Sequence, residues 1–260
     1  MAHRLRTGLA YARGPVCNFA SWLFTSKEHT NFTYDLTDLN KRYLAAFVSQ
    51  VAGVDYVRAS KYIAELDQDS SIRAHIRQAT ESSKERRFAD ADPEFGRRLG
   101  WYAIVRSAKP RVVVETGVDK GLGSCVLACA LMRNSEEGHP GRYYGTDINP
   151  SAGYLFQEPY ADFGEILYGD SIDSLRDLDG PIDVFIHDSD HSADYEAREY
   201  SAVQDKLSES AVVISDNAHA TGELLRFSRR TGRQFLFFKE QPDRHWYPGG
   251  GIGAAFKRGV

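Results

Sequence analysis

Polar side chains that could bind a metal ion or move a proton follow two apolar stretches in the C-terminal half of the chain. The stretch 182–186 leads into His187-Asp188-Ser189-Asp190-His191, and the stretch 211–214 leads into Ser215-Asp216-Asn217-Ala218-His219. If both stretches are strands of one parallel sheet, their carboxyl ends meet at one edge. Asp188, Asp216 and Asn217 then offer the hard oxygen ligands that Mg²⁺ or Ca²⁺ prefers. This edge is therefore a candidate divalent-metal site.

The same two segments leave several roles open. Asp188 alone could cap the helix that follows it, and Asp190 could replace it as a ligand if the strand ends later. His187 lies within the strand pattern and is expected to point away from the site or to pack. A metal-bound hydroxyl is easier to deprotonate, and an imidazole with an ordinary pKa of about 6.5 can take the proton. His219 is a candidate for that base, or a residue of a first helical turn.

A second feature lies upstream, where a β-branched run breaks into glycines. Residues 111–114 predict a strand that leads into Glu115, and Gly117 and Gly121 predict a tight turn before an apolar helix near 125–132. Glycines there let a ligand approach the backbone, and the free N–H groups of the helix N-terminus face the same place. A nucleotide-like ligand suits this turn, although any tight strand-to-helix turn favours glycine.

Acidic residues recur where the predicted strands end. They are Glu115, Asp147, Asp170, Asp188 and Asp216. In an open sheet, ligands bind beyond the carboxyl ends of the strands, so these acids are expected around one crevice. Asp147 is placed to accept hydrogen bonds from a ribose diol, and Asp170 could accept one from an adenine amino group.

The order of predicted elements indicates an α/β fold. Strands near 143–147, 166–170, 182–188 and 211–216 follow the glycine turn, with helical segments between most of them. This alternation predicts a doubly wound, mostly parallel sheet covered by helices on both faces. The late strands 235–238 and 252–256 are close in sequence and are expected to pair antiparallel at the sheet edge.

The N-terminal third is expected to form a helical cap. Helices are predicted from Thr37 to Gly53, from Tyr56 to Leu66 and from Ser70 to Ala79, whereas residues 1–30 show no clear period. The charged segment 81–94 marks a boundary before an amphipathic helix at 95–108. We therefore predict two regions. They are a cap, lid or dimerisation region at 1–92 and a ligand-binding domain at 93–260.

Composition limits the classes of function. The chain has 260 residues, a net charge of −4 and a pI near 6.1, which does not favour a nucleic-acid or membrane-surface partner. Its cysteines are Cys17, Cys125 and Cys129, and we interpret them as free thiols of a reducing compartment. No apolar run approaches the roughly 18 residues of a bilayer span, and the first residues lack the apolar core of a signal peptide. A cytoplasmic location is expected.

The cofactor half of the pattern resembles the class I S-adenosylmethionine-dependent methyltransferases over about residues 95–256. The matching residues are Glu115-Thr116-Gly117 with Gly121, Gly145-Thr146-Asp147, and Gly169-Asp170-Ser171. The resemblance implies that S-adenosylmethionine is bound by Glu115, Gly117, Gly121, Ser124, Asp147, Asp170 and Ser171. An NAD-binding oxidoreductase is the rival interpretation. The turn, however, is not Gly-x-Gly-x-x-Gly, and the two late strands fit the methyltransferase sheet better than a dehydrogenase sheet.

The second half is similar to metal-dependent O-methyltransferases, both the catechol type and the macrolide-sugar type. The resemblance implies that Asp188, Asp216 and Asn217 hold Mg²⁺ or another divalent cation, and that His191 in Asp188-x-x-His191 is the general base. The catechol type has a lysine soon after its first metal acid, whereas the next lysine here is Lys206. The sugar type usually has two acids where this chain has Asp216-Asn217.

These features predict an O-methyltransferase that acts on a hydroxyl of a small molecule. The resemblance of Asp188-x-x-His191 to the sugar type implies a sugar or glycoside acceptor, with a phenolic acceptor as the second choice. From another class, a non-catalytic relative that keeps the cofactor pocket is the alternative. The loop 241–251 is expected to contact the acceptor, while Phe32, Tyr34 and Tyr43 are expected to close over the site or form a dimer interface.

Overall fold

Alternating strands and helices from residue 112 onwards build a mixed sheet in the computed structural model, which describes residues 1–29 and 32–257. Within that part of the chain the sheet has seven strands in the order β3-β2-β1-β4-β5-β7-β6. The strands are β1 (Val112–Thr116), β2 (Arg142–Asp147), β3 (Gly164–Tyr168), β4 (Ile182–His187), β5 (Leu207–Ser215), β6 (Gln234–Lys239) and β7 (Gly251–Phe256). The first five are parallel, and β7 pairs antiparallel with both β5 and β6. The predicted doubly wound fold with an antiparallel edge is confirmed.

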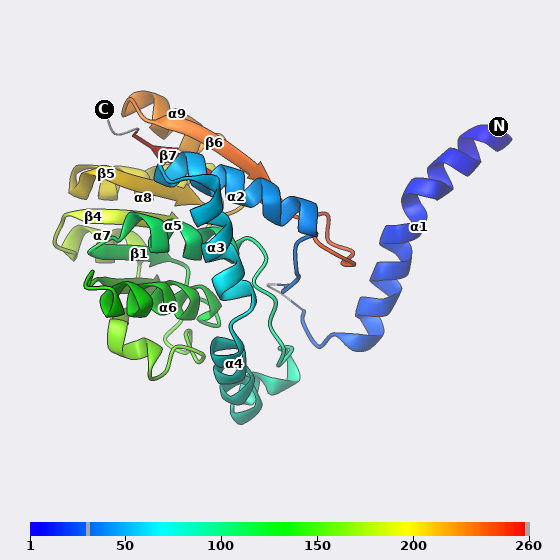
Figure 1. The fold of residues 1–260 in the computed structure, drawn as a ribbon, viewed down its shortest axis with the longest axis horizontal. Coiled ribbons are helices and arrows are strands. Elements are labelled where there is room, and N and C mark those ends of the chain that lie inside the picture. Colours follow the sequence, from blue (N-terminus) through cyan, green and yellow to red (C-terminus); the bar gives the residue numbers. More distant parts are fainter. Residues whose placement is uncertain (30–31, 258–260) are drawn as a thin grey trace.

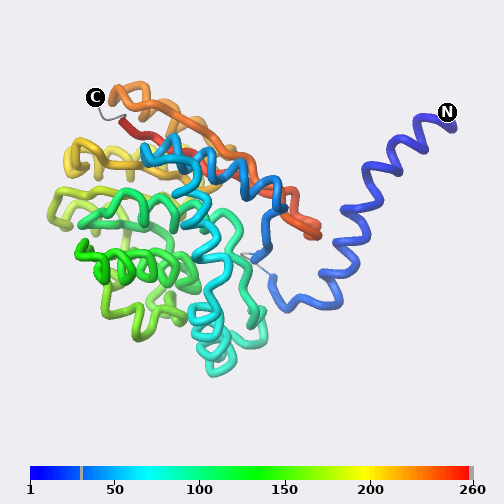
Figure 2. The backbone as a smooth tube through the Cα atoms, viewed as in Figure 1, coloured from blue at the N-terminus to red at the C-terminus, as the bar shows by residue number. Residues whose placement is uncertain are grey.

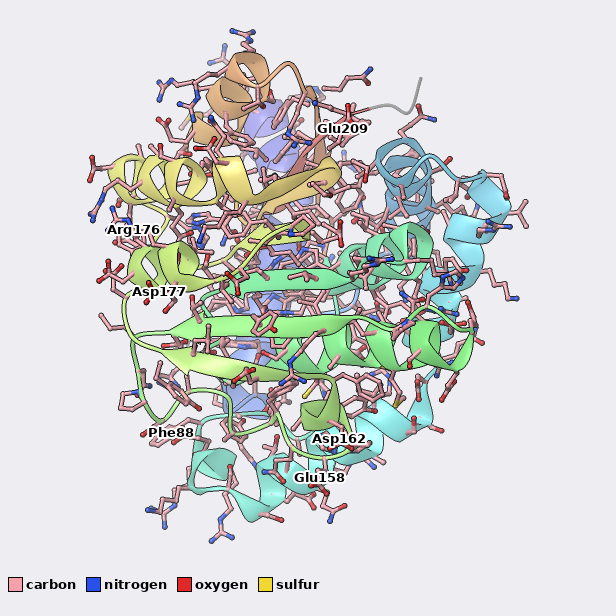
Figure 3. All side chains as sticks on the ribbon, turned by 90° about the vertical axis from the view of Figure 1, so that its left-hand side faces the viewer. Phe88, Glu158, Asp162, Arg176, Asp177 and Glu209 are labelled. Atoms are coloured by element: carbon pink, nitrogen blue, oxygen red, sulfur yellow. The ribbon has the colours of Figure 1, made fainter. Side chains whose placement is uncertain are left out.

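Helices cover both faces of the sheet (Figures 1 and 3). They are α1 (Ala2–Thr25), α2 (Asp38–Ala52), α3 (Tyr56–Asp67), α4 (Ser70–Ser82), α5 (Arg98–Ala108), α6 (Leu122–Glu136), α7 (Ser171–Asp177), α8 (Ala193–Val203) and α9 (Glu223–Arg230). Successive strand residues alternate between the faces. Val113 packs in the core under α2 to α6, whereas Val114 packs in the core under α7, α8 and α9.

The helices α2, α3 and α4 form where the sequence supplies their caps. The side chains of Thr37, Asp55 and Asp69 each accept a hydrogen bond from a backbone N–H of the first helical turn. Gly53 ends α2 in the left-handed conformation, at φ 64°. Short 3₁₀ segments lie at Lys84–Arg87, Tyr160–Phe163 and Gln204–Lys206. The apolar sides of α2 to α4 share one hydrophobic core with the sheet.

Helix α5 differs from the amphipathic helix that its sequence suggests. Its residues from Leu99 to Arg106 are all buried. The reason is that α6 lies on one side of α5 while α2 and α3 pack against it from another. Residues far away in the sequence therefore cover the side that would otherwise face solvent.

Helix α1 was not predicted, because residues 1–30 carry no clear period. It projects away from the rest of the molecule (Figures 1 and 2) and none of its side chains is buried. Near its C-terminal end, the rings of Phe19 and Trp22 lie 5.8 and 5.3 Å from that of Trp246. Phe24 stays exposed.

Two strand boundaries also differ from the prediction. Strand β3 ends at Tyr168 rather than Asp170, because the Asp170 side chain already caps α7 through the N–H groups of Ile172 and Asp173. Strand β5 begins at Leu207, before the apolar run itself, and its pairing with β4 shifts register between Ile182 and Val184. No helix among the described residues combines the length and the apolarity of a membrane span.

Candidate active site

The site lies where the order of the strands reverses. The chain passes from β1 outwards to β2 and β3, and then returns to add β4 on the other side of β1. Such switch points leave a crevice at the carboxyl ends of the two central strands. At this point Gly117 has a φ of 85°, and a Cβ there would overlap the backbone of Asp188. Glycine is required here because the ends of β1 and β4 approach so closely.

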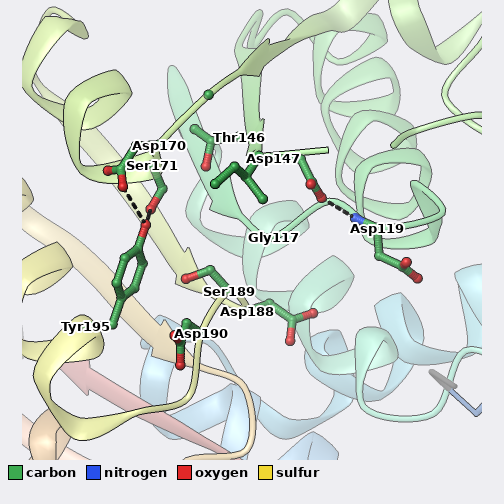
Figure 4. A pocket seen from close by; sticks show the side chains of 12 residues that line it. Gly117, Asp119, Thr146, Asp147, Asp170, Ser171, Asp188, Ser189, Asp190 and Tyr195 are labelled. Atoms are coloured by element: carbon green, nitrogen blue, oxygen red, sulfur yellow. Dashed lines mark hydrogen bonds between the residues drawn. The ribbon is translucent and has the colours of Figure 1, made fainter. Parts of the chain in front are cut away.

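Two adjoining pockets open at this edge. The first pocket is lined by residues from the ends of β2, β3 and β4, including Asp147, Asp170 and Tyr195 (Figure 4). The second pocket is lined by several charged side chains, including Arg97, Arg98 and Lys120, and by His191. The two pockets share Gly117, Asp119, Asp188 and Ser189. One elongated ligand could therefore extend through both.

The acids of the first pocket are held in place by their own loops. Asp147 accepts hydrogen bonds from the backbone N–H groups of Asp119 and Asn149, both at 2.8 Å. Asp170 uses one oxygen to cap α7, and its other oxygen lies 3.4 Å from the Tyr195 hydroxyl. Both predicted nucleoside contacts thus line one cavity (Figure 4), and Tyr195 joins them without having been predicted.

Glu199 on α8 ties together the elements around the first pocket. This fully buried carboxylate accepts hydrogen bonds from Thr116, Ser171, Ser189 and His187, with His187 Nδ1 at 2.6 Å. His187 is buried, as predicted. A buried charge is tolerated when several donors surround it. The predicted cofactor residue Ser171 lines the pocket, while its hydroxyl is bound by Glu199 and Tyr195.

Glu115 lies at the floor of the second pocket. It is 1% exposed and accepts hydrogen bonds from the hydroxyls of Tyr143 and Ser124. Ser124 is itself fully buried behind Glu115 and lines neither pocket. Gly121 is also set back, and caps α6 in a left-handed conformation against Gly153. Both therefore shape the turn in this structure rather than reach the cavity.

Burial raises the pKa of Glu115 to about 7. The hydrogen bonds from Tyr143 and Ser124, and the nearby charge of Arg98, favour the ionised form but do not offset the loss of solvent. A cationic group in the second pocket would restore the ionised state. The acid is therefore suited to receive a positively charged part of a ligand.

The predicted metal ligands come together on the other side of the second pocket. Oxygen and nitrogen atoms of Asp188, His191 and Asp216 lie within 4.8 Å of one another. Asp216 is fully buried and is bound by Arg97 through two hydrogen bonds, with Nη2 to Oδ2 at 2.6 Å. Arg97 lies just before α5 and was not predicted as a site residue.

The two carboxylates of this cluster titrate in opposite directions. Burial and the neighbouring charge of Asp216 raise the pKa of Asp188 well above its usual range. Burial also opposes the ionisation of Asp216, but the charge of Arg97 and the hydrogen bond from Asp188 lower its pKa. One proton is thus shared by two close carboxylates. A divalent cation could take the place of that proton.

The donor set suits such a cation. Two carboxylates and one imidazole converge. When a cation replaces the shared proton, the two negative charges of the carboxylates exceed the single positive charge of Arg97. Asn217, at φ 50°, directs its Nδ2 group at His191 (3.2 Å) and Asp216 (3.1 Å). Turning the amide about its last torsion would present Oδ1 instead. The predicted ligands fit a divalent metal on these grounds.

His191 is the better placed of the two predicted bases. It is half-buried, lines the second pocket, and has its Nε2 atom 3.7 Å from Asp188. Burial, together with the neighbouring His187, lowers its pKa, so the ring is neutral near pH 7. His219 is exposed in a turn before α9 and does not line the pocket. Asp190 is exposed because β4 ends at His187, which leaves Asp188 in the cluster.

A hydrogen-bonded chain links the metal cluster to the N-terminal region. Arg97 lies 3.4 Å from the hydroxyl of Tyr34, which donates to Glu240 at 2.5 Å. Tyr34 and Glu240 are buried, and Leu36 pairs with Pro242 across the same junction. The segment 32–36 and the loop after β6 are therefore fixed beside the second pocket. Tyr43 is exposed and does not line it.

The loop after β6 packs its aromatic side chains on the N-terminal segment. The rings of His245, Trp246 and Tyr247 all contact Phe32, with centroid distances between 5.2 and 6.2 Å. None of these four rings lines either pocket. The expected contact of this loop with an acceptor stays a prediction.

Comparison with known proteins assigns the central part of the chain. Residues 114–218 match the family described as "Methyltransferase domain". The matched segment covers 105 of the 260 residues, and it is similar to that family over this part of the chain. It spans β1 to β5 and includes the residues after these strands that line the two pockets, the glycine turn, and the Asp188–Asp216 cluster. A comparison with curated protein sequences gave no significant match.

Solved structures share the fold of this domain. The O-methyltransferase TomG from Streptomyces achromogenes, in complex with SAM, is 18% identical with a TM-score of 0.54, over 75% of this chain and 92% of TomG. SAH-bound PaMTH1 from Podospora anserina is 14% identical with a TM-score of 0.52, over 77% and 94% of the two chains. A methyltransferase from Geobacter sulfurreducens is 21% identical with a TM-score of 0.52, over 79% and 99%. The fold is that of these methyltransferases.

Proposed function

We propose that this protein is an S-adenosylmethionine-dependent O-methyltransferase that acts on a hydroxyl of a polar small molecule with the help of a divalent cation. The observation that carries the proposal is the junction of the two pockets. Acids suited to a nucleoside line the first pocket. Asp188 and His191 line the second, with Asp216 buried beside them, and Gly117 and Asp188 border both pockets. The family match and the shared fold favour a methyltransferase over an NAD-binding oxidoreductase.

The first pocket has the groups that an adenosine moiety needs. Asp147 and Asp170 each keep lone pairs that are not used by their backbone partners, and Tyr195 offers a ring beside them. S-adenosylmethionine supplies a methyl group activated by a sulfonium charge. The raised pKa of Glu115 and of Asp188 gives this edge two acids that a positively charged ligand would ionise.

The second pocket has the groups that a hydroxyl acceptor needs. His191 is neutral near pH 7 and can accept the hydroxyl proton, while Asp188 and Asn217 hold its ring from one side. Asp188, Asp216 and Asn217 are the residues that would hold Mg²⁺, which lowers the cost of deprotonating a bound hydroxyl. Arg97 keeps Asp216 ionised and oriented toward this position.

The polar lining favours a sugar or another polyhydroxylated acceptor over a phenol. Charged side chains at the start of α5, in the glycine turn and after β4 line the second pocket, and no Phe, Tyr or Trp side chain of the described residues is among them. A planar phenol gains most from aromatic contact, whereas a polyol gains from many hydrogen-bonding groups.

Calorimetry with S-adenosylhomocysteine and with NAD⁺ tests the cofactor. We expect micromolar binding of S-adenosylhomocysteine, weakened in Asp147→Ala, because that carboxylate lines the nucleoside pocket. Arg142→Ala, on an exposed position of the same strand, is the matched control and should bind normally. Binding of NAD⁺ in place of S-adenosylhomocysteine would overturn the proposal. A screen of hydroxylated acceptors with a labelled methyl donor then identifies the acceptor.

A further inference from the structure

Arg98 has no salt-bridge partner among the described residues, although its charge acts on Glu115 and Asp188. Its guanidinium lines the second pocket, its Nε atom is buried, and no hydrogen-bond acceptor in the described part of the chain contacts it. The side chain lies over the ring of Trp101, 5.4 Å from the centroid. Cation–π contact favours a cation but leaves its N–H donors unused. A buried donor without a partner is uncommon, and because Arg98 lines the pocket, an acceptor from outside the chain could reach its guanidinium.

Lys120 is a second cation in the same pocket with an incomplete partner. Its Nζ atom lies 3.9 Å from Glu28, too far for a hydrogen bond. The oxygens of Glu28 already accept hydrogen bonds from the backbone N–H and the hydroxyl of Thr33, at 2.8 and 3.1 Å. Lys120 therefore has donors to spare. This distinguishes Arg98 and Lys120 from Arg97, whose guanidinium binds Asp216.

The acids nearby do not form close ion pairs with these two cations. Among the described residues no carboxylate forms a salt bridge with Arg98, and the carboxylate beside Lys120 is that of Glu28, 3.9 Å away. The edge of the pocket formed by Arg98 and Lys120 therefore carries a net positive charge. An anion is the chemical complement of that edge.

We infer that Arg98 and Lys120 form a carboxylate-binding subsite of the second pocket, with Arg98 as its main contact. The planar guanidinium can bind both oxygens of a carboxylate, and the ammonium of Lys120 can add a further hydrogen bond. The inference rests on the proposed function, because that function decides which ligands enter. The carboxylate comes from one of two sources. It belongs to the amino-acid end of the cofactor or to an acidic hydroxylated acceptor.

Two probes separate the cofactor source from other effects. S-adenosylhomocysteine carries the amino-acid carboxylate, whereas 5′-methylthioadenosine has the same nucleoside and thioether without it. If the cofactor supplies the carboxylate, Arg98→Gln weakens binding of S-adenosylhomocysteine by about 10- to 100-fold, the size of a charge-assisted hydrogen bond. Binding of methylthioadenosine stays within about threefold, which also shows that the variant is folded.

A second measurement addresses the acceptor source. Wild-type protein and the variants are assayed with hydroxylated carboxylic acids and with their methyl esters, using a labelled methyl donor. If the acceptor supplies the carboxylate, the wild type prefers the acids by at least about tenfold in kcat/KM, and Arg98→Gln or Lys120→Gln removes that preference. Arg98→Lys keeps the charge and should restore part of either effect. Arg229→Gln, an exposed arginine of α9 outside both pockets, is the matched control.

The outcomes are separable. If Arg98→Gln loses affinity for S-adenosylhomocysteine but not for methylthioadenosine, the subsite binds the carboxylate of the cofactor. If Arg98→Gln or Lys120→Gln loses the preference for acids over their esters, the subsite binds the carboxylate of the acceptor. Equal behaviour of wild type, Arg98→Gln and Lys120→Gln in both measurements overturns the inference while the proposed function stands. If wild-type protein binds neither nucleoside, the proposed function itself fails.

Discussion

Replacing Glu115 by glutamine is expected to stabilise the ligand-free protein at pH 8 and to change it little at pH 5. Burial raises the pKa of this carboxyl from 4.5 to about 7. Between these pH values the folded protein keeps the proton that the unfolded chain has lost, so the stability of the wild type falls as the pH rises. At about 1.36 kcal/mol per pKa unit, the full difference is about 3 kcal/mol above pH 7. Glutamine is neutral throughout and avoids this loss.

Urea denaturation at the two pH values measures the effect. The free energy of unfolding of Glu115→Gln, relative to wild type, should be about 2 to 3 kcal/mol larger at pH 8 than at pH 5. The amide can still accept the hydrogen bonds from Tyr143 and Ser124, so most of the packing is kept. Glu209→Gln is the control, because Glu209 is exposed on β5 (Figure 3) and should respond equally at both pH values.

Other buried acids whose pKa is raised, such as Glu28 and Glu240, are present in both proteins and cancel in the comparison. If the free energy of unfolding of wild type and of Glu115→Gln changes by the same amount between pH 5 and pH 8, ionisation of the Glu115 carboxyl does not destabilise the folded protein. The reasoning about its burial would then be refuted.

Three further outcomes are expected. Arg97→Ala should lower the free energy of unfolding by about 3 to 5 kcal/mol because it leaves Asp216 buried without its partner; chemical denaturation measures this, and a loss below about 1 kcal/mol contradicts it. His191→Ala should lower kcat by about 10²-fold or more and leave the affinity for S-adenosylhomocysteine intact. In the wild type kcat/KM should fall as the pH drops through the lowered pKa of His191, and the variant should lose this fall. A larger loss of kcat in His219→Ala would reassign the base. Removing divalent cations with EDTA should abolish turnover, and adding Mg²⁺ should restore it. Asp216→Ala should stay inactive in Mg²⁺ and show no Mg²⁺ binding by calorimetry. Full turnover of the wild type in EDTA excludes the metal role.

Much of the fold could be predicted because the evidence for it is local. The caps at Thr37, Asp55 and Asp69 act on N–H groups two or three residues away, and the glycines at 117 and 121 adopt positive φ within one turn. The alternation of strands and helices then sets a parallel sheet. Because parallel strands end at a common edge, the acids after β2, β3, β4 and β5 had to meet around one crevice.

The sequence by itself thus determined the fold class, the crevice and the gathering of Asp147, Asp170, Asp188 and His191 around it, with Asp216 buried beside them. Only the tertiary structure decided which groups surround them. Arg97 pairs with Asp216 across 119 residues, and Glu199 binds donors that come from four separate elements or loops.

Such pairings have no period or motif, because they depend on where helices finally pack against the sheet. The same packing buried Ser124 behind Glu115 and enclosed α5 on all sides. It also left Arg98 facing the second pocket without a hydrogen-bond partner in the described residues. Burial and charge compensation are properties of the assembled core, and they set the pKa values on which the chemistry of this site depends.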